Sequence, residues 1–255
     1  MIDFHSHIIP YIDDGSKNLD MSIEMLEMSF NDGVEYICAT PHFIAGESEI
    51  ERLNYDEKLN NLKEISKIKD LNVKILNGLE LYIHPELPKL YKSGRVWGIN
   101  DSNYLLIELP MNHFPLYTEE VFYELRLMGA TPILAHPERN SKLRDNIMLL
   151  ENLIDQGTLT QVTSGSLNGL YGKDVKAFAE LLVKKNMVHL VGSDAHNNSG
   201  RNTMMKKEYG IIKEINKDLF NWIEENQFNI INNRSVNIPE IIKIKKRFSF
   251  FKMFS

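Results

Sequence analysis

The stretch Met1-Ile2-Asp3-Phe4-His5-Ser6-His7 decides the fold, because an apolar strand pattern runs directly into two histidines. Alternate residues of a strand point to the same side, so His5 and His7 are placed to bind one metal ion together. Asp14 follows in the turn Ile12-Asp13-Asp14-Gly15, where a carboxylate can fold back over the end of the strand. Two histidines at this spacing are a weak signal alone, since ordinary polar strand residues give the same pattern.

Later strand-like runs end in residues of the same kind. In a parallel β/α barrel the carboxyl ends of the strands converge on one face, and active sites are built there. A single site at that face would collect nitrogen and oxygen ligands from most of the chain. The candidate metal ligands are His5, His7, Asp14, His42, Glu80, Glu108, His136, Asp194 and His196.

This ligand set predicts a metal cluster. Nine ligands are too many for one ion and suit two or three ions. The set contains no thiolate, which favours Mn, Fe or Zn over softer metals.

The order of these residues resembles the polymerase and histidinol phosphatase (PHP) family of metal-dependent phosphoesterases. Within that family the chain is similar over nearly its whole length to the bacterial protein-tyrosine phosphatases of capsule and exopolysaccharide operons, the CpsB/YwqE type. The motifs that carry this likeness are Ile12-Asp13-Asp14-Gly15, Leu106-Ile107-Glu108, Ala135-His136-Pro137-Glu138-Arg139 and Gly192-Ser193-Asp194-Ala195-His196-Asn197.

The alternation of strand-like and helix-like segments predicts an α/β fold, and seven strand-like runs predict a distorted seven-stranded TIM-like (β/α)7 barrel. The resemblance implies the same fold, the PHP fold. A length of 255 residues fits one barrel domain, expected over residues 1–240. Helical spacing predicts helices at 19–32, 60–69, 119–128, 146–156, 175–185 and 217–232.

Residues 241–255 form a separate tail that mixes basic and aromatic side chains. Such a tail predicts peripheral contact with an anionic membrane surface or a membrane protein. The alternative is a tail that packs on the barrel or frays.

Composition narrows the possible partners and location. A net charge of −6 argues against nucleic acid as the main partner, because phosphate backbones select basic surfaces. The single cysteine, Cys38, fits a reducing, cytoplasmic compartment. It also disfavours a cysteine-dependent tyrosine phosphatase, because Ile44 stands where the required arginine would be. We expect no cleaved signal peptide, since the first strand begins at residue 2, and no run approaches the length of a membrane span.

The resemblance implies three metal positions. Asp14 and Glu108 stand where many relatives have histidines, which shifts the preference to harder ions, Mn²⁺ first with Fe or Zn as alternatives. Glu80 would bridge two of the positions. The implied sets are His5, His7, Glu80 and Asp194; Glu80, Glu108 and His136; and Asp14, His42 and His196.

The resemblance implies a metal-dependent protein-tyrosine phosphatase, a phosphoric monoester hydrolase. Its substrate would be phosphotyrosine on a bacterial tyrosine kinase that controls capsule or exopolysaccharide synthesis. A metal-bound hydroxide would attack phosphorus in line. Arg139 and Arg201 would hold the phosphoryl oxygens, because the planar guanidinium matches phosphate. A surface salt bridge is the alternative role for either arginine.

Two other enzymes fit the same ligands. The first is histidinol-phosphate phosphatase, and the second, less favoured, is a PHP-type nuclease. The loops after the second, third and fourth strands carry aromatic rings that could stack on an aryl ester and so favour phosphotyrosine. These residues are Phe43, Tyr82, His84, His113, Phe114 and Tyr117.

Overall fold

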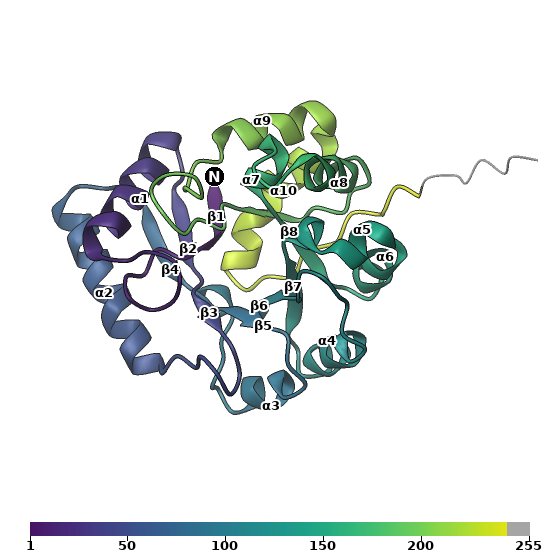
Figure 1. The fold of residues 1–255 in the computed structure, drawn as a ribbon, viewed down its shortest axis with the longest axis horizontal. Coiled ribbons are helices and arrows are strands. Elements are labelled where there is room, and N and C mark those ends of the chain that lie inside the picture. Colours follow the sequence, from purple (N-terminus) through teal and green to yellow (C-terminus); the bar gives the residue numbers. More distant parts are fainter. Residues whose placement is uncertain (244–255) are drawn as a thin grey trace, which may run out of the picture.

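The computed structural model describes residues 1–243 of the chain (Figure 1). The tail predicted from residue 241 therefore lies, except for its first three residues, outside the described part. No helix within residues 1–243 is long and apolar enough to cross a membrane.

The strands are parallel to their neighbours and lie in a three-stranded and a six-stranded sheet that together make a curled half-barrel. This confirms a mixed α/β fold with parallel strands. The smaller sheet has the order β1 (Ile2–Ser6), β2 (Tyr36–Ala39) and β4 (Lys74–Asn77). The larger has the order β3 (His42–Phe43), β5 (Glu80–Tyr82), β6 (Tyr104–Glu108), β7 (Thr131–Ala135), β8 (Leu159–Thr163) and β9 (Leu190–Gly192).

Two of the predicted strands are each interrupted, which explains the division into two sheets. β2 stops before Pro41, which has no backbone N–H to continue the ladder, and β3 begins directly after it. β4 stops at Gly78, where a Cβ atom would lie only 2.9 Å from the Cγ2 atom of Thr40. At the other edge, β1 reaches the segment after β9, since the His7 amide donates to the Ala195 carbonyl at 2.9 Å.

Helices surround the strands (Figure 1). α2 begins at Arg52 rather than at residue 60, because Tyr55 and Leu59 lie on its buried face, which its many charged residues obscure in the sequence. The helix predicted at 146–156 is confirmed as α6, whereas the short helices α3, α5 and α7 and the helix α9 were not predicted. The helices are α1 (Leu19–Asp32), α2 (Arg52–Ile68), α3 (Leu87–Lys92), α4 (Thr118–Leu127), α5 (Ser141–Asp145), α6 (Met148–Asp155), α7 (Ser164–Asn168), α8 (Lys173–Lys184), α9 (Lys206–Ile215) and α10 (Lys217–Ile231).

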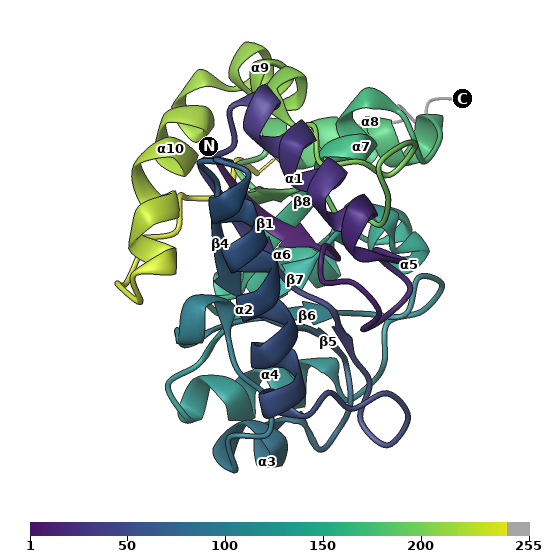
Figure 2. The same ribbon diagram turned by 90° about the vertical axis from the view of Figure 1, so that its left-hand side faces the viewer.

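Alternate residues of the strands face two different apolar clusters. On β6, Leu105 and Ile107 pack in the cluster between strands and helices, whereas Leu106 belongs to the inner cluster. Ile230 and Ile231 of α10 join that inner cluster, and in Figure 2 α10 lies where β1 begins. The beginnings of the strands are therefore covered by a helix, and the opposite, carboxyl ends remain for the site.

Candidate metal centre

The carboxyl ends of the strands bring all nine predicted ligands together. Within the described residues, three groups of donor atoms lie close enough to share an ion, with all atoms of a group within 4.8 Å of one another. These groups are His5, His7, Glu80 and Asp194; His7, Asp14, His42 and His196; and His42, Glu80 and Glu108. His136 lies beside them, with its Nε2 atom 2.9 Å from Oε1 of Glu80.

Glu80 lies at the middle of the cluster and is fully buried. Its Oε2 atom lies 3.1 Å from Nε2 of His5, 3.2 Å from Nε2 of His7 and 3.0 Å from Nδ1 of His42. Its other oxygen faces His136. One carboxylate thus contacts four imidazoles from three different strand ends, which is the arrangement a bridging ligand needs.

The histidines of β1 are oriented for metal binding. Nδ1 of His5 lies 2.8 Å from Oε1 of Gln161, and Nδ1 of His7 lies 2.6 Å from Oδ2 of Asp13. Because both partners are acceptors, each Nδ1 carries the proton and each Nε2 presents a lone pair. The two Nε2 atoms are 3.1 Å apart, so two lone pairs face each other.

A cation about 2.0–2.1 Å from each nitrogen would turn that repulsion into coordination. Two further atoms in the cluster support the same conclusion. Nδ1 of His42 and Oε2 of Glu80 are buried, and neither has a hydrogen-bond partner in the part of the chain that the structure describes. The residues present therefore fit divalent metal ions.

Two candidate ligands have left-handed backbone conformations. φ is 32° at His136, which directly follows β7, and 52° at Asp194, which lies two residues after the end of β9. Non-glycine residues rarely adopt this conformation, and it costs on the order of 1–3 kcal/mol. The Asp194 amide donates to the His5 carbonyl at 2.7 Å, which holds the strained turn against β1.

The carboxylates of the cluster lie in different electrostatic surroundings. Burial raises the pKa of Glu108, and the neighbouring Glu80 raises it further. Burial opposes ionisation of Glu80 as well, but the adjacent imidazoles of His5 and His42 outweigh it and lower the pKa of Glu80. Asp14 lies at the solvent side, with its side chain 66% exposed and Oδ1 3.4 Å from Nε2 of His196.

Both predicted arginines reach the cluster through one oxygen atom. Nη1 of Arg139 and Nη2 of Arg201 lie 2.5 and 2.8 Å from Oδ2 of Asp194. The other carboxylate oxygen of Asp194 faces His5, His7 and His196, at 3.5 Å in each case. Asp194 thus joins the arginines to the histidines, and neither arginine forms the surface salt bridge that was the alternative.

Two residues that support the cluster were missed. Asp13 was passed over for its neighbour Asp14, yet its Oδ2 atom accepts hydrogen bonds from His7 and from the His42 amide at 3.0 Å. The Asp13-Asp14 pair was a visible signal, since two acidic residues can divide the roles. Gln161 lies within β8, a strand without charged residues, and the sequence offers no signal for it.

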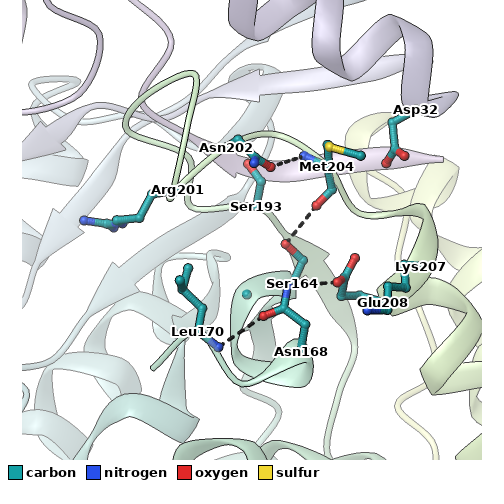
Figure 3. Close-up of a pocket in the computed structure, with 12 residues that line it drawn as sticks. Asp32, Ser164, Asn168, Leu170, Ser193, Arg201, Asn202, Met204, Lys207 and Glu208 are labelled. Carbon is teal, nitrogen blue, oxygen red and sulfur yellow. Dashed lines mark hydrogen bonds between the residues drawn. The ribbon is translucent and has the colours of Figure 1, made fainter. Parts of the chain in front are cut away.

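The hydroxyl groups of the segment after β8 form hydrogen bonds within the protein. Ser164 begins α7, and its Oγ atom donates to the Met204 carbonyl at 3.3 Å. Oγ of Ser166 donates to Oε1 of Glu138 at 2.7 Å. Figure 3 shows the cavity of about 370 Å³ that Ser164 lines together with Arg201 and Glu208. These hydroxyls are therefore already engaged in hydrogen bonds within the protein.

The aromatic residues predicted at the rim occupy different environments. Phe43 is fully buried, so the prediction that it flanks the substrate is wrong. Tyr82 lines a cavity of about 370 Å³ together with His42, Asp14 and Glu108. Phe114 and Tyr117 are partly buried against the core. Tyr82 is therefore the ring best placed beside the candidate metal ligands.

Comparisons with known proteins agree with this site. A model of the family described as capsular polysaccharide synthesis, CpsB/CapC, matches residues 1–232. The chain is 38% identical over 254 residues to the tyrosine-protein phosphatase YwqE of Bacillus subtilis, covering 98% of this chain and 100% of the relative.

Solved structures give the same result. One from work on YwqE of Bacillus subtilis and CpsB of Streptococcus pneumoniae, described as metal-dependent tyrosine phosphatases, superposes with a TM-score of 0.90 and 36% identity, over 96% of this chain and 100% of that one. Histidinol phosphate phosphatase of Lactococcus lactis, solved with zinc, L-histidinol and phosphate, has a TM-score of 0.57 and 13% identity, over 84% and 93% of the two chains. This second likeness shows a shared fold alone.

Proposed function

The chain belongs to the CpsB/CapC family of capsular polysaccharide synthesis, and we propose that it is a metal-dependent protein-tyrosine phosphatase acting on a bacterial tyrosine kinase. One structural observation carries the proposal. A buried carboxylate, Glu80, contacts four imidazoles, and Asp194 connects that cluster to two arginines. Cations beside guanidinium groups form a site for a phosphate monoester.

We propose that the site holds up to three divalent ions, with Mn²⁺ as the first candidate. Glu80 would bridge two of them, and Asp14 would complete the outermost site. The mixed nitrogen and oxygen donors support harder ions of this kind. When bound, such ions lower the pKa of water and offset the negative charge of the phosphoryl group.

The arginines would bind the phosphoryl oxygens. Each guanidinium uses one nitrogen on Asp194 and has further N–H groups for a substrate oxygen. Asp194 would fix the position of the phosphoryl group relative to the metal ions. Because a tyrosine leaving group has a pKa of about 10, it needs little help from a general acid.

Two finer statements belong to the same proposal. We propose that the two sheets act as one seven-stranded barrel, supported by the hydrogen bonds between β1 and the segment after β9. We also place the protein in the cytoplasm, supported by the buried, free thiol of Cys38. The tail beyond residue 243 has no part in this argument.

The test is substrate choice by the metal-loaded, full-length protein. A phosphotyrosine peptide and histidinol phosphate are hydrolysed side by side, and kcat/KM is compared. We expect a much higher value for the peptide, because Tyr82 offers a ring beside the metal centre and the cavity that it lines opens to solvent. Equal or better turnover of histidinol phosphate would replace this assignment by a role in histidine biosynthesis.

The kinase is tested separately. A tyrosine kinase phosphorylated on its own tyrosines, from a bacterium that carries this protein, is incubated with the wild-type phosphatase or with the Asp194→Asn variant. Loss of phosphotyrosine with the wild type alone is the expected result. A peptide that is hydrolysed while the kinase keeps its phosphate would leave the activity and remove this partner.

A further inference from the structure

Tyr171 lies against both arginines of the site, although the sequence gave no reason to select it. It follows α7 in the turn before α8, and its side chain is half-buried. The Cζ atom of Arg139 lies 4.5 Å from the centre of the Tyr171 ring, so the guanidinium is stacked over the ring face. Such a contact is attractive because the face of an aromatic ring is electron-rich.

The hydroxyl end of Tyr171 is directed toward the second arginine. The positive charge of Arg201 acts on this hydroxyl, but burial dominates and raises the pKa of Tyr171, so the hydroxyl stays protonated at neutral pH. Tyr171 Oη and Arg201 Nε are both buried without a hydrogen-bond partner in the described part of the chain. Two polar atoms that are buried here without partners cost free energy in the folded protein.

The two arginine side chains need a neighbouring group that holds them in position. Arg139 ends a 3-10 turn and Arg201 lies in the loop between β9 and α9, so no helix or strand fixes either side chain. Both donate to the same oxygen of Asp194, which places two positive charges close together. A long side chain that is free to rotate loses about 2 kcal/mol of entropy when it binds. A tyrosine ring that holds the guanidinium plane in place before the phosphoryl group binds reduces this loss of entropy.

We infer that Tyr171 is a positioning residue for phosphoryl binding, whose ring holds the plane of Arg139 and whose hydroxyl lies beside Arg201 and restricts its movement. The inference rests on the proposed function, because it assigns the arginines to the phosphoryl group. Tyr171 acts through the arginines, so its removal should weaken phosphate binding without changing the metal content.

The experiment measures binding of inorganic phosphate to the metal-loaded protein by calorimetry, and kcat and KM for a phosphotyrosine peptide. Tyr171→Leu removes the ring and the hydroxyl, and we expect phosphate affinity and kcat/KM to fall about tenfold, within the range of one cation–π contact. Tyr171→Phe keeps the stacking and should lose about threefold. The control is Tyr91→Leu in α3, where a half-buried tyrosine donates to Asn103, and it should leave phosphate affinity unchanged.

A double variant separates positioning from a general structural role. With Arg139→Ala in place, the ring has nothing to stack on, so Tyr171→Leu should then cost only about threefold, the loss that comes from the hydroxyl beside Arg201. The full tenfold loss in that background would overturn the inference, as would unchanged phosphate affinity in Tyr171→Leu. If Tyr171→Leu does not fold, Tyr171→Phe still decides, because wild-type phosphate affinity in that variant overturns the role of the hydroxyl.

The calorimetric measurement of phosphate binding does not depend on which phosphate ester is the substrate. Should the wild-type protein prefer histidinol phosphate, the proposed function fails, yet inorganic phosphate still reports on the two arginines. A loss of phosphate affinity in Tyr171→Leu then supports the inference on its own.

Discussion

The Nε2 atoms of His5 and His7 face each other at 3.1 Å, while each ring is held from behind by a different residue. Without a cation between them the two lone pairs repel, and the nearby oxygens of Glu80 and Asp194 do not relieve this unless a histidine is protonated. Holding the two imidazoles together therefore costs free energy in the metal-free protein, and a bound cation would remove this cost. Several measurable consequences come from this relationship and from the residues around it.

Removal of the metal should destabilise the fold. A chelator is expected to lower the thermal unfolding midpoint and abolish phosphatase activity, and Mn²⁺ should restore both. A ligand at 100 times its Kd stabilises the native state by about 2.7 kcal/mol per site. Elemental analysis of protein purified without chelator should give more than one transition metal ion per chain. A ratio of one or less in fully active protein would contradict the multinuclear site.

Loss of Gln161 should weaken metal binding without touching a ligand. Its Oε1 atom accepts from Nδ1 of His5, so Gln161→Leu frees the ring to rotate or to change tautomer. Such supporting residues typically change metal affinity by about 10–100-fold. Metal titration with a fluorescent competitor measures the effect. Gln156→Leu, on the exposed end of α6, is the control and should bind metal like the wild type.

An added methyl group at Gly192 should displace His5. A Cβ atom there would lie 2.5 Å from the Cβ atom of His5 and 2.9 Å from Nε2 of Gln161. Overpacking of this kind costs about 1–3 kcal/mol, and we expect Gly192→Ala to lose stability and metal together. Gly210→Ala is the matched control, because Gly210 lies in α9 with open space around it in the described chain. The control should gain about 0.5–1 kcal/mol, whereas unchanged metal content in Gly192→Ala would refute the argument.

Removal of Arg201 should slow the reaction and spare the cluster. If its guanidinium stabilises the transferring phosphoryl group, Arg201→Ala should lower kcat by about 10²–10³-fold. Arg139 still holds Oδ2 of Asp194, so metal content should stay the same. Arg95→Ala breaks an exposed pair with Glu49 and provides the control. Turnover near the wild-type value in Arg201→Ala would place that residue outside the site.

His189 should make stability depend on pH, far from the metal. Its buried Nδ1 accepts from the Thr160 amide at 3.0 Å, and burial lowers the pKa of the ring from 6.5 to about 3. Below pH 6.5 the unfolded chain takes up a proton that the folded chain refuses, so stability falls as pH drops from 6.5 toward 3. At about 1.4 kcal/mol per pH unit, the full loss is on the order of 5 kcal/mol.

Denaturant unfolding at pH 7 and pH 5 measures this dependence. His189→Gln should flatten the decline between the two values, although it will lower stability at pH 7. His113→Gln replaces an exposed histidine and should leave the slope unchanged. An identical pH slope in His189→Gln and the wild type would show that other groups cause the decline.

The sequence predicted much of the site because the ligands follow a rule of the fold. Every candidate ligand except Asp14 comes at or just after the carboxyl end of a strand-like run, so the positions of His136 and Asp194 could be predicted from local pattern and resemblance. The arginines were predicted in the same way, because each follows a ligand motif within a few residues.

Other features depend on packing that local pattern does not encode. Gln161 is uncharged and supports His5 only because β8 lies beside β9, which in turn lies against β1. Tyr171 contacts Arg139 through a turn that no periodicity predicts. The start of α2 was placed too late because its charged residues hide Tyr55, whose hydroxyl donates to the Ala39 carbonyl at 2.8 Å.

The contact between the first strand and the segment after β9 also bears on how the protein is made. Asp3 accepts hydrogen bonds from the amide and hydroxyl of Ser193, a partner 190 positions away in sequence. During synthesis the chain emerges from its N-terminus, so His5 and His7 leave the ribosome long before Asp194 and Arg201 exist. A nascent chain therefore has exposed histidines but no complete cluster, and the site that would hold metal ions is completed only when translation is nearly finished. Contacts at such separation are also slow to form, so the edge of β1 that faces β9 stays unpaired long after its other edge can pair with β2.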